Sequence, residues 1–148
     1  MAQEFELLSH TADSKIRAYG ITLEELFRNT LKGMFASIKP YGTHITYKND
    51  ELICSKFTLQ HTVTTHSLDL QSLLVDFLSD CLYLSDIHNE AYFDARFTLL
   101  TSTELQCSIF GVPIAGFELL EIKAVTYNDL AIEQNQDGIW QATVVFDI

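Results

Sequence analysis

The sequence is 148 residues long, which suits one domain with a single hydrophobic core. Its hydrophobic content of 47% and charged content of 20% are ordinary for a globular protein and argue against disorder. Nine Lys and Arg residues stand against 20 Asp and Glu residues, giving a formal net charge of −11. Because nucleic-acid binding depends on clustered basic side chains, this charge disfavours direct, tight binding to nucleic acid. It suits a basic protein partner or a divalent cation, or it serves solubility alone.

The apolar stretches are short, and the N-terminus lacks the basic segment and apolar core of a signal peptide. We therefore expect no membrane span and a cytoplasmic location. The three cysteines, Cys54, Cys81 and Cys107, are widely separated and form neither a CxxC motif nor a Cys/His cluster. We interpret them as thiols of the core rather than as zinc ligands or a disulfide framework.

Two strands separated by a polar turn are predicted first. An apolar run over residues 5–8 stops at residues 9–13 (Ser-His-Thr-Ala-Asp), and an alternating run restarts at Ile16. Thr22 and Glu25 then form a capping box, which predicts the start of a helix. Apolar residues continue at helical spacing over 23–38, and Pro40 and Gly42 end this helix.

A second helix is the clearest signal of the sequence. After a polar connection over residues 43–50 and a strand at about 51–60, residues 61–67 are expected to lead into this helix. Asp69 is its predicted N-cap, and an unbroken apolar stripe runs from Leu70 to Leu82. We interpret Asp76, Asp80 and Asp86 on the other side as a solvated helix face.

The rest of the chain is predicted as strands, at residues 92–101, 104–109, 121–126, 130–133 and 139–147, with a loop at 111–116. In the last strand, alternation places Asp147 on the more polar face with Gln141 and Thr143. This order of elements predicts an α+β single domain over residues 1–148. We expect two layers, a mostly antiparallel β-sheet with two main helices packed on one face.

Asp13, Asp147 and the terminal carboxylate of Ile148 are the main candidate site. If the first and last strands are neighbours, these anions crowd together and favour a cation between them. Carboxylate oxygens suit a hard ion such as Ca²⁺ or Mg²⁺, although from spacing alone two exposed carboxylates without a ligand are the favoured interpretation. Motifs of nucleotide-binding loops, zinc proteases and serine hydrolases are absent, and His61 and His66 are weak ligand candidates.

Five blocks, in this order along nearly the whole chain, resemble the archease family. They are His10-Thr-Ala-Asp13, Arg17-Ala-Tyr-Gly20 with Thr22-Leu-Glu-Glu25, Leu73-Leu-Val-Asp-Phe-Leu78 with Leu82-Tyr-Leu84, Lys123-Ala-Val-Thr-Tyr127, and Phe146-Asp-Ile148. The resemblance implies a small metal-binding protein that activates the tRNA-splicing RNA ligase, which joins a 3′-phosphate or 2′,3′-cyclic phosphate end to a 5′-hydroxyl end. The protein would promote guanylylation and turnover of that Mn²⁺-dependent ligase without catalysing the joining itself.

The same resemblance implies roles for individual residues. Asp13, Asp147 and Ile148 would form the metal site, typically for Ca²⁺, with Mg²⁺ and Mn²⁺ as alternatives. No catalytic residue is implied. The predicted residues for partner contact and activation are His10, Thr11, Lys123 and Tyr127. Asn128 stands where the family usually has His, so a role of that imidazole does not carry over.

These observations predict a non-enzymatic protein with the RNA ligase as its protein partner, no membrane association, and a monomeric or weakly oligomeric state. Two other functions stay open. One is a chaperone-like partner of a tRNA-modifying enzyme such as a methyltransferase. The other is a metal-dependent phosphohydrolase, which the lack of a second carboxylate-rich motif disfavours.

Overall fold

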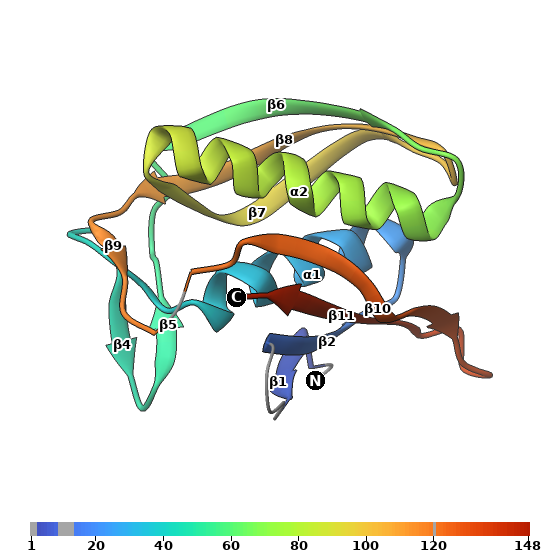
Figure 1. The fold of residues 1–148 in the computed structure, drawn as a ribbon, viewed down its shortest axis with the longest axis horizontal. Coiled ribbons are helices and arrows are strands. Elements are labelled where there is room, and N and C mark those ends of the chain that lie inside the picture. Colours follow the sequence, from blue (N-terminus) through green and yellow to red (C-terminus); the bar gives the residue numbers. More distant parts are fainter. Residues whose placement is uncertain (1–2, 9–13, 120) are drawn as a thin grey trace.

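The computed structural model describes residues 3–8, 14–119 and 121–148 (Figure 1). The helices of this part of the chain are α1 (Leu23–Ser37) and α2 (Leu70–His88). The strands of its first half are β1 (Phe5–Leu8), β2 (Ser14–Gly20), β3 (Pro40–Tyr41), β4 (Thr46–Lys48), β5 (Glu51–Ile53) and β6 (Leu59–His66). Those of its second half are β7 (Glu90–Leu100), β8 (Glu104–Pro113), β9 (Gly116–Phe117), β10 (Ala124–Gln134) and β11 (Trp140–Asp147).

The long strands form two antiparallel sheets, one ordered β1-β2-β11-β10 and the other β6-β8-β7. Both helices lie between these sheets, because α1 contacts β2 and β7 while α2 contacts β10 and β6 (Figure 1). Two small pairs, β3–β9 and β4–β5, lie at one end of the molecule. The predicted α+β fold with antiparallel strands and two main helices is confirmed, with the strands divided between two sheets.

The core fills the space between the sheets and both helices. Its centre is an aromatic cluster in which the ring centroids of Phe27 and Phe77 are 5.9 Å apart and those of Phe77 and Phe97 are 5.8 Å apart. Cys81 and Cys107 are buried here as free thiols, as predicted. Burial raises the pKa of the Cys107 thiol to about 12, so this sulfur stays protonated and unreactive.

Both predicted helix starts are confirmed by their caps. The Thr22 hydroxyl accepts a hydrogen bond from the Glu25 N–H at 3.1 Å, and the Glu25 carboxylate accepts one from the Ile21 N–H at 3.4 Å. The Asp69 carboxylate accepts a hydrogen bond from the Ser72 N–H at 2.8 Å. The bonds from the Glu25 and Ser72 N–H groups satisfy backbone donors that the first turn of a helix leaves free, which is why Thr22 and Asp69 fix where α1 and α2 begin.

The prediction for residues 51–67 is wrong in its boundaries. The expected strand at 51–60 breaks after β5, and residues 61–66, expected as a lead-in to the helix, belong to β6. Along β6 only Val63 and Thr65 are buried, while the neighbouring residues face solvent. A strand with so few buried apolar side chains gives a weak alternating pattern, and its β-branched threonines are the residues that favour it.

The acidic residues of α2 are not simply a solvated face. The Asp76 carboxylate accepts a hydrogen bond from the Ser67 hydroxyl at 2.6 Å, and the Asp80 carboxylate accepts one from the Thr65 hydroxyl at 2.7 Å. These bonds join α2 to β6 and to the turn that follows it. Asp80 and Asp86 are exposed, as expected of a solvated face, whereas Asp76 is half-buried and the expectation is wrong for this residue.

β8 and β10 are longer than predicted. β8 continues into the expected loop as far as Pro113, and β10 joins residues 124–126 of one expected strand to the next expected strand at 130–133, whereas residues 121–123 precede it. The ladder between β10 and β11 shifts its register between Thr126 and Ala131, which explains why the sequence pattern breaks there. The hairpin at residues 101–103 is confirmed.

Candidate functional site

The end of β11 carries two of the three predicted metal ligands. β11 is a central strand, held between β2 and β10 (Figure 1). Phe146 is fully buried, whereas the next residue, Asp147, is exposed and Ile148 is 36% exposed. A buried aromatic residue therefore anchors the strand directly before the two residues that carry carboxylates into solvent.

The neighbours of this strand end come from both ends of the sequence. Phe146 pairs with Ser14 of β2, and Asp147 pairs with Ala124 of β10. The N–H of Lys123 donates a hydrogen bond of 2.7 Å to the carbonyl oxygen of Asp147. Lys123 is exposed and lies beside Asp147 along the backbone. The structure thus brings together Asp147, Ile148 and the predicted partner residue Lys123.

Three predicted site residues, His10, Thr11 and Asp13, lie outside the described residues. Their position in the site stays a prediction. The described neighbour of Asp13 in the sequence is Ser14, which opens β2 at the same edge of the sheet where β11 ends.

The outer face of β11 is more buried than its polar residues predict. Thr143 is 7% exposed and Val145 only 1%. Their cross-strand partners on β2 are Arg17 and Lys15, and the Arg17 guanidinium donates to the Thr143 hydroxyl at 3.4 Å. Lys15 in turn lies 3.7 Å from the carboxylate of Asp129. The face that alternation predicts as the more polar one is therefore buried at Thr143 and Val145, where long basic side chains of β2 flank the residues next to Asp147.

Tyr127 lies in the irregular part of β10 and is 58% exposed. The Thr126 hydroxyl fixes this segment, because it donates to the carbonyl oxygen of Val145 at 2.9 Å and accepts a hydrogen bond from the Asn128 N–H at 3.2 Å. Tyr127 therefore projects from a backbone segment held against β11. Its exposure leaves its phenol ring free for contact with another molecule.

Further negative charge gathers around the start of β10. Burial and the charge of Glu121 raise the pKa of the Asp86 carboxyl above its ordinary value of 3.8. Asp86 belongs to the last part of α2, and Glu121 precedes Lys123 by two residues. Sequence reasoning missed this pair, because a helix residue and a loop residue far apart in the chain meet only through the fold.

No group of three or more His, Cys, Asp and Glu side chains in the described part of the chain is placed to hold a metal ion. The predicted set includes Asp13, which is outside that part, and a main-chain carboxylate. The chemistry of Asp147 and the C-terminus is that of oxygen ligands for a hard cation. These two groups would need a third anionic ligand to form a site.

The sequence matches the model of the Archease protein family (MTH1598/TM1083) over residues 5–148. The chain belongs to the archease family. A curated archease from Methanosarcina acetivorans is 39% identical to this archease, over 99% of this chain and 97% of the relative. A curated archease from Pyrococcus furiosus is 33% identical, over 99% of this chain and 99% of the relative. A protein named archease-like from Drosophila melanogaster is 31% identical, over 98% of this chain and 90% of the relative.

Solved structures agree with the fold of this archease. The solution structure of Methanobacterium thermoautotrophicum protein 1598 is 26% identical, with a TM-score of 0.69 over 97% of this chain and 98% of that one. A Thermotoga maritima crystal structure, described as an archease and possible chaperone, has a TM-score of 0.60 at 21% identity, over 100% of this chain and 98% of that one. In the described part of this archease, neither helix is long and apolar enough to cross a membrane.

Proposed function

We propose that this archease is a non-catalytic accessory protein that activates the tRNA-splicing RNA ligase by promoting its guanylylation and turnover. In this proposal, Asp13, Asp147 and the terminal carboxylate of Ile148 hold a divalent cation, Ca²⁺ in the first instance. Because the exposed Asp147 and Ile148 lie beside the exposed Lys123, the ligase would contact the bound cation and a basic side chain on the same surface.

The register between β2 and β11 is the observation that carries the proposal. Seven consecutive pairs run from Trp140 with Gly20 to Phe146 with Ser14. One further pair in the same register would join Asp147 to Asp13. The Cβ atoms of directly opposite residues in an antiparallel ladder are about 4.5–5.5 Å apart, which suits two carboxylates that share a cation. Family membership supports the same assignment.

The chemistry of the ligands favours a hard ion that keeps free coordination positions. Ca²⁺ takes about 6–8 oxygen ligands, more than two aspartates and a chain terminus supply when each binds through one oxygen. The remaining positions are open to water or to an oxygen of the partner. A cation here also lowers the repulsion among the carboxylates that share it.

The charge of the whole protein fits a protein partner better than RNA. The net charge of −11 repels a phosphate backbone, whereas it attracts a basic protein surface and raises its association rate. In this proposal Lys123 and Tyr127 are contact residues, since Lys123 is exposed directly before β10 and Tyr127 is exposed within this edge strand. The ligase then carries out all the bond-forming chemistry.

A guanylylation assay tests this function. The cognate ligase is incubated with radiolabelled GTP and Mn²⁺, and covalent ligase–GMP is measured with time. We expect wild-type protein to raise the rate several-fold, Asp147→Asn to lose most of this effect, and Asp137→Asn to keep it. Asp137 is the matched control, because it is an exposed aspartate in the turn between β10 and β11. Equal rates with and without the wild-type protein would reject the proposal.

A chaperone-like function is the second candidate, motivated by the description of the Thermotoga maritima protein as a possible chaperone. It predicts stable association with a tRNA-modifying enzyme such as a methyltransferase, and protection of that enzyme from aggregation. The protection should be the same for wild type and Asp147→Asn. Absence of both association and protection with the wild-type protein would reject this candidate.

A further inference from the structure

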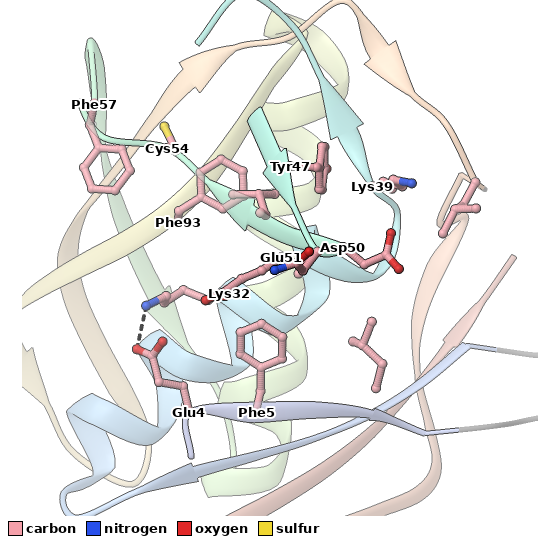
Figure 2. A pocket seen from close by; sticks show the side chains of 15 residues that line it. Glu4, Phe5, Lys32, Lys39, Tyr47, Asp50, Glu51, Cys54, Phe57 and Phe93 are labelled. Carbon is pink, nitrogen blue, oxygen red and sulfur yellow. Dashed lines mark hydrogen bonds and ion pairs between the residues drawn. The ribbon is translucent and has the colours of Figure 1, made fainter. Parts of the chain in front are cut away.

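A pocket of about 660 Å³ lies between β1, α1 and the β4–β5 hairpin (Figure 2). Pockets of about 300–1,000 Å³ are the usual size of ligand sites. None of its lining residues belongs to the site at the end of β11. The lining comes from segments that are distant in the sequence, at residues 4–7, 32–39, 47–57, 93 and 119.

The lining is largely apolar, and part of it is exposed. Leu7 is the cross-strand partner of Ile16, which is fully buried on the side of the sheet that the helices cover. Leu7 nevertheless stays 53% exposed. Phe57 and Leu119 at the pocket are 37% and 65% exposed. Covering such side chains would stabilise a complex by about 25 cal/mol per Å² of apolar surface.

The charges at the pocket are unbalanced. Lys32 forms an ion pair with Glu4 at 2.5 Å, and Lys39 forms one with Glu118 at 3.4 Å, so both pocket lysines already have carboxylate partners.

Asp50 and Glu51 are exposed on the β4–β5 hairpin, and within the described residues neither has an ion-pair partner. The uncompensated charge of the pocket is therefore negative, and it favours an occupant with a positive group.

One wall of the pocket is β1, whose outer edge pairs with no other strand in the described part of the chain. β1 is the outermost strand of its sheet and supplies Phe5 and Leu7 to the lining. In Figure 2, β1 runs along one side of the pocket and the Phe5 ring points into it. An edge strand has backbone N–H and C=O groups that its sheet leaves unpaired, and an extended peptide can bind to them as an added strand.

We propose that this pocket binds an extended, basic segment of a partner protein. The segment pairs with the free edge of β1, places an aromatic or branched aliphatic side chain against Phe5 and Leu7, and sets a neighbouring Lys or Arg beside Asp50 and Glu51. This surface is distinct from the predicted metal site, so it can bind while that site is empty or altered.

Peptide titration, followed by ¹⁵N–¹H spectra of the labelled protein, tests this binding. The probe is acetyl-Arg-Val-Phe-Val-Arg-amide, and its controls carry Gln or Glu in place of both Arg residues. We expect saturable shifts in β1 and at residues 49–54, with a Kd on the order of 0.1 mM. The Gln peptide should bind several-fold more weakly and the Glu peptide more weakly still. Equal binding of all three peptides, or an absence of shifts at about 1 mM, would overturn the proposal.

Variants of the protein and a modified peptide test separately the charge preference, the pocket and the strand pairing of this proposal. Asp50→Asn combined with Glu51→Gln should remove the preference for Arg over Gln; Asn is chosen because residue 50 has a φ of +62°, where Asn is well tolerated. Ala36→Leu, which extends a lining residue of α1 into the pocket, should weaken all peptides, whereas Asp137→Asn should change nothing.

Methylation of alternate backbone nitrogens of the peptide should also weaken binding. Unchanged binding after this modification would refute strand addition. Concentration-dependent dimers in sedimentation, formed without peptide through β1, would instead assign the surface to a second copy of the chain and overturn the proposal.

Discussion

Phe146 and Ser14 are cross-strand partners, which joins the last strand of the chain to the strand that follows its first polar turn. Phe146 is fully buried, so this pairing is anchored in the core and not only by backbone hydrogen bonds. The exposed Asp147 and Ile148 extend from that anchor. The fold therefore determines where Asp147 and Ile148 lie.

Truncation of Phe77 tests the packing of the two helices. This ring is fully buried and contacts the rings of Phe27 and Phe97. Phe77→Ala should lower the free energy of unfolding by about 3–5 kcal/mol in urea titrations, through lost burial and the cavity left behind. Tyr83→Ala on the same helix is the control, since Tyr83 is 64% exposed and should change stability by at most about 0.5 kcal/mol. Similar losses for both variants would contradict the packing described here.

The N-cap of α1 should make a smaller, local contribution. Thr22→Ala removes the acceptor for the Glu25 N–H and should lower the free energy of unfolding by about 1 kcal/mol. Thr22→Ser keeps a hydroxyl at the cap and should restore most of this loss. If Ser and Ala are equally destabilising in thermal unfolding, the methyl group and not the hydrogen bond accounts for the effect.

The raised pKa of Asp86 should make the free energy of unfolding of the protein depend on pH. The pKa of Asp86 is higher in the folded protein than its ordinary value of 3.8. The stability that the protonated carboxyl contributes is therefore fully present below pH 3.8, and it is lost as the pH rises through the pKa of the folded protein. Asp86→Asn should therefore stabilise the protein at pH 7 and have less effect at pH 3. Carboxyl ¹³C titration should also show Glu121→Gln lowering the pKa of Asp86. An Asp86 pKa unaffected by this substitution would contradict the proximity of the two carboxyls.

Substitution of Lys123 should affect contact with the partner without affecting folding. Only its backbone N–H bonds to Asp147, so Lys123→Ala keeps that hydrogen bond and should leave stability and cation affinity unchanged. In the guanylylation assay the variant should activate the ligase less than wild type does. Lys48→Ala, another exposed lysine, is the control. Full activation by Lys123→Ala would remove this residue from the proposed contact surface.

Local signals in the sequence located most elements of the fold. Thr22, Glu25 and Asp69 identified the starts of both helices, because capping is a matter of a few neighbouring residues. The alternation at residues 140–147 likewise identified β11. Strand β6 was missed because Val63 is its one fully apolar buried residue, so that the pattern resembles a polar connection.

Features that depend on tertiary contacts were not visible in the sequence. The division of the strands into two sheets follows from how β7 and β2 pack on α1, not from any local pattern. The Asp86–Glu121 pair and the pocket beside Leu7 arise in the same way, from residues far apart in the chain. The grouping of Asp13 with Asp147 rested on the assumption of neighbouring strands, and the pairing of β2 with β11 supports that assumption.

Calorimetric titration with Ca²⁺ tests most directly whether both ends of the chain hold one cation. We expect the wild-type protein to bind one ion, Asp13→Asn and Asp147→Asn to bind it at least tenfold more weakly, and Asp137→Asn to bind it unchanged. Each substitution should lower the affinity by itself, because each removes one ligand of a shared site. Wild-type affinity in Asp147→Asn, or no binding of Ca²⁺, Mg²⁺ or Mn²⁺ by the wild-type protein, would contradict the account.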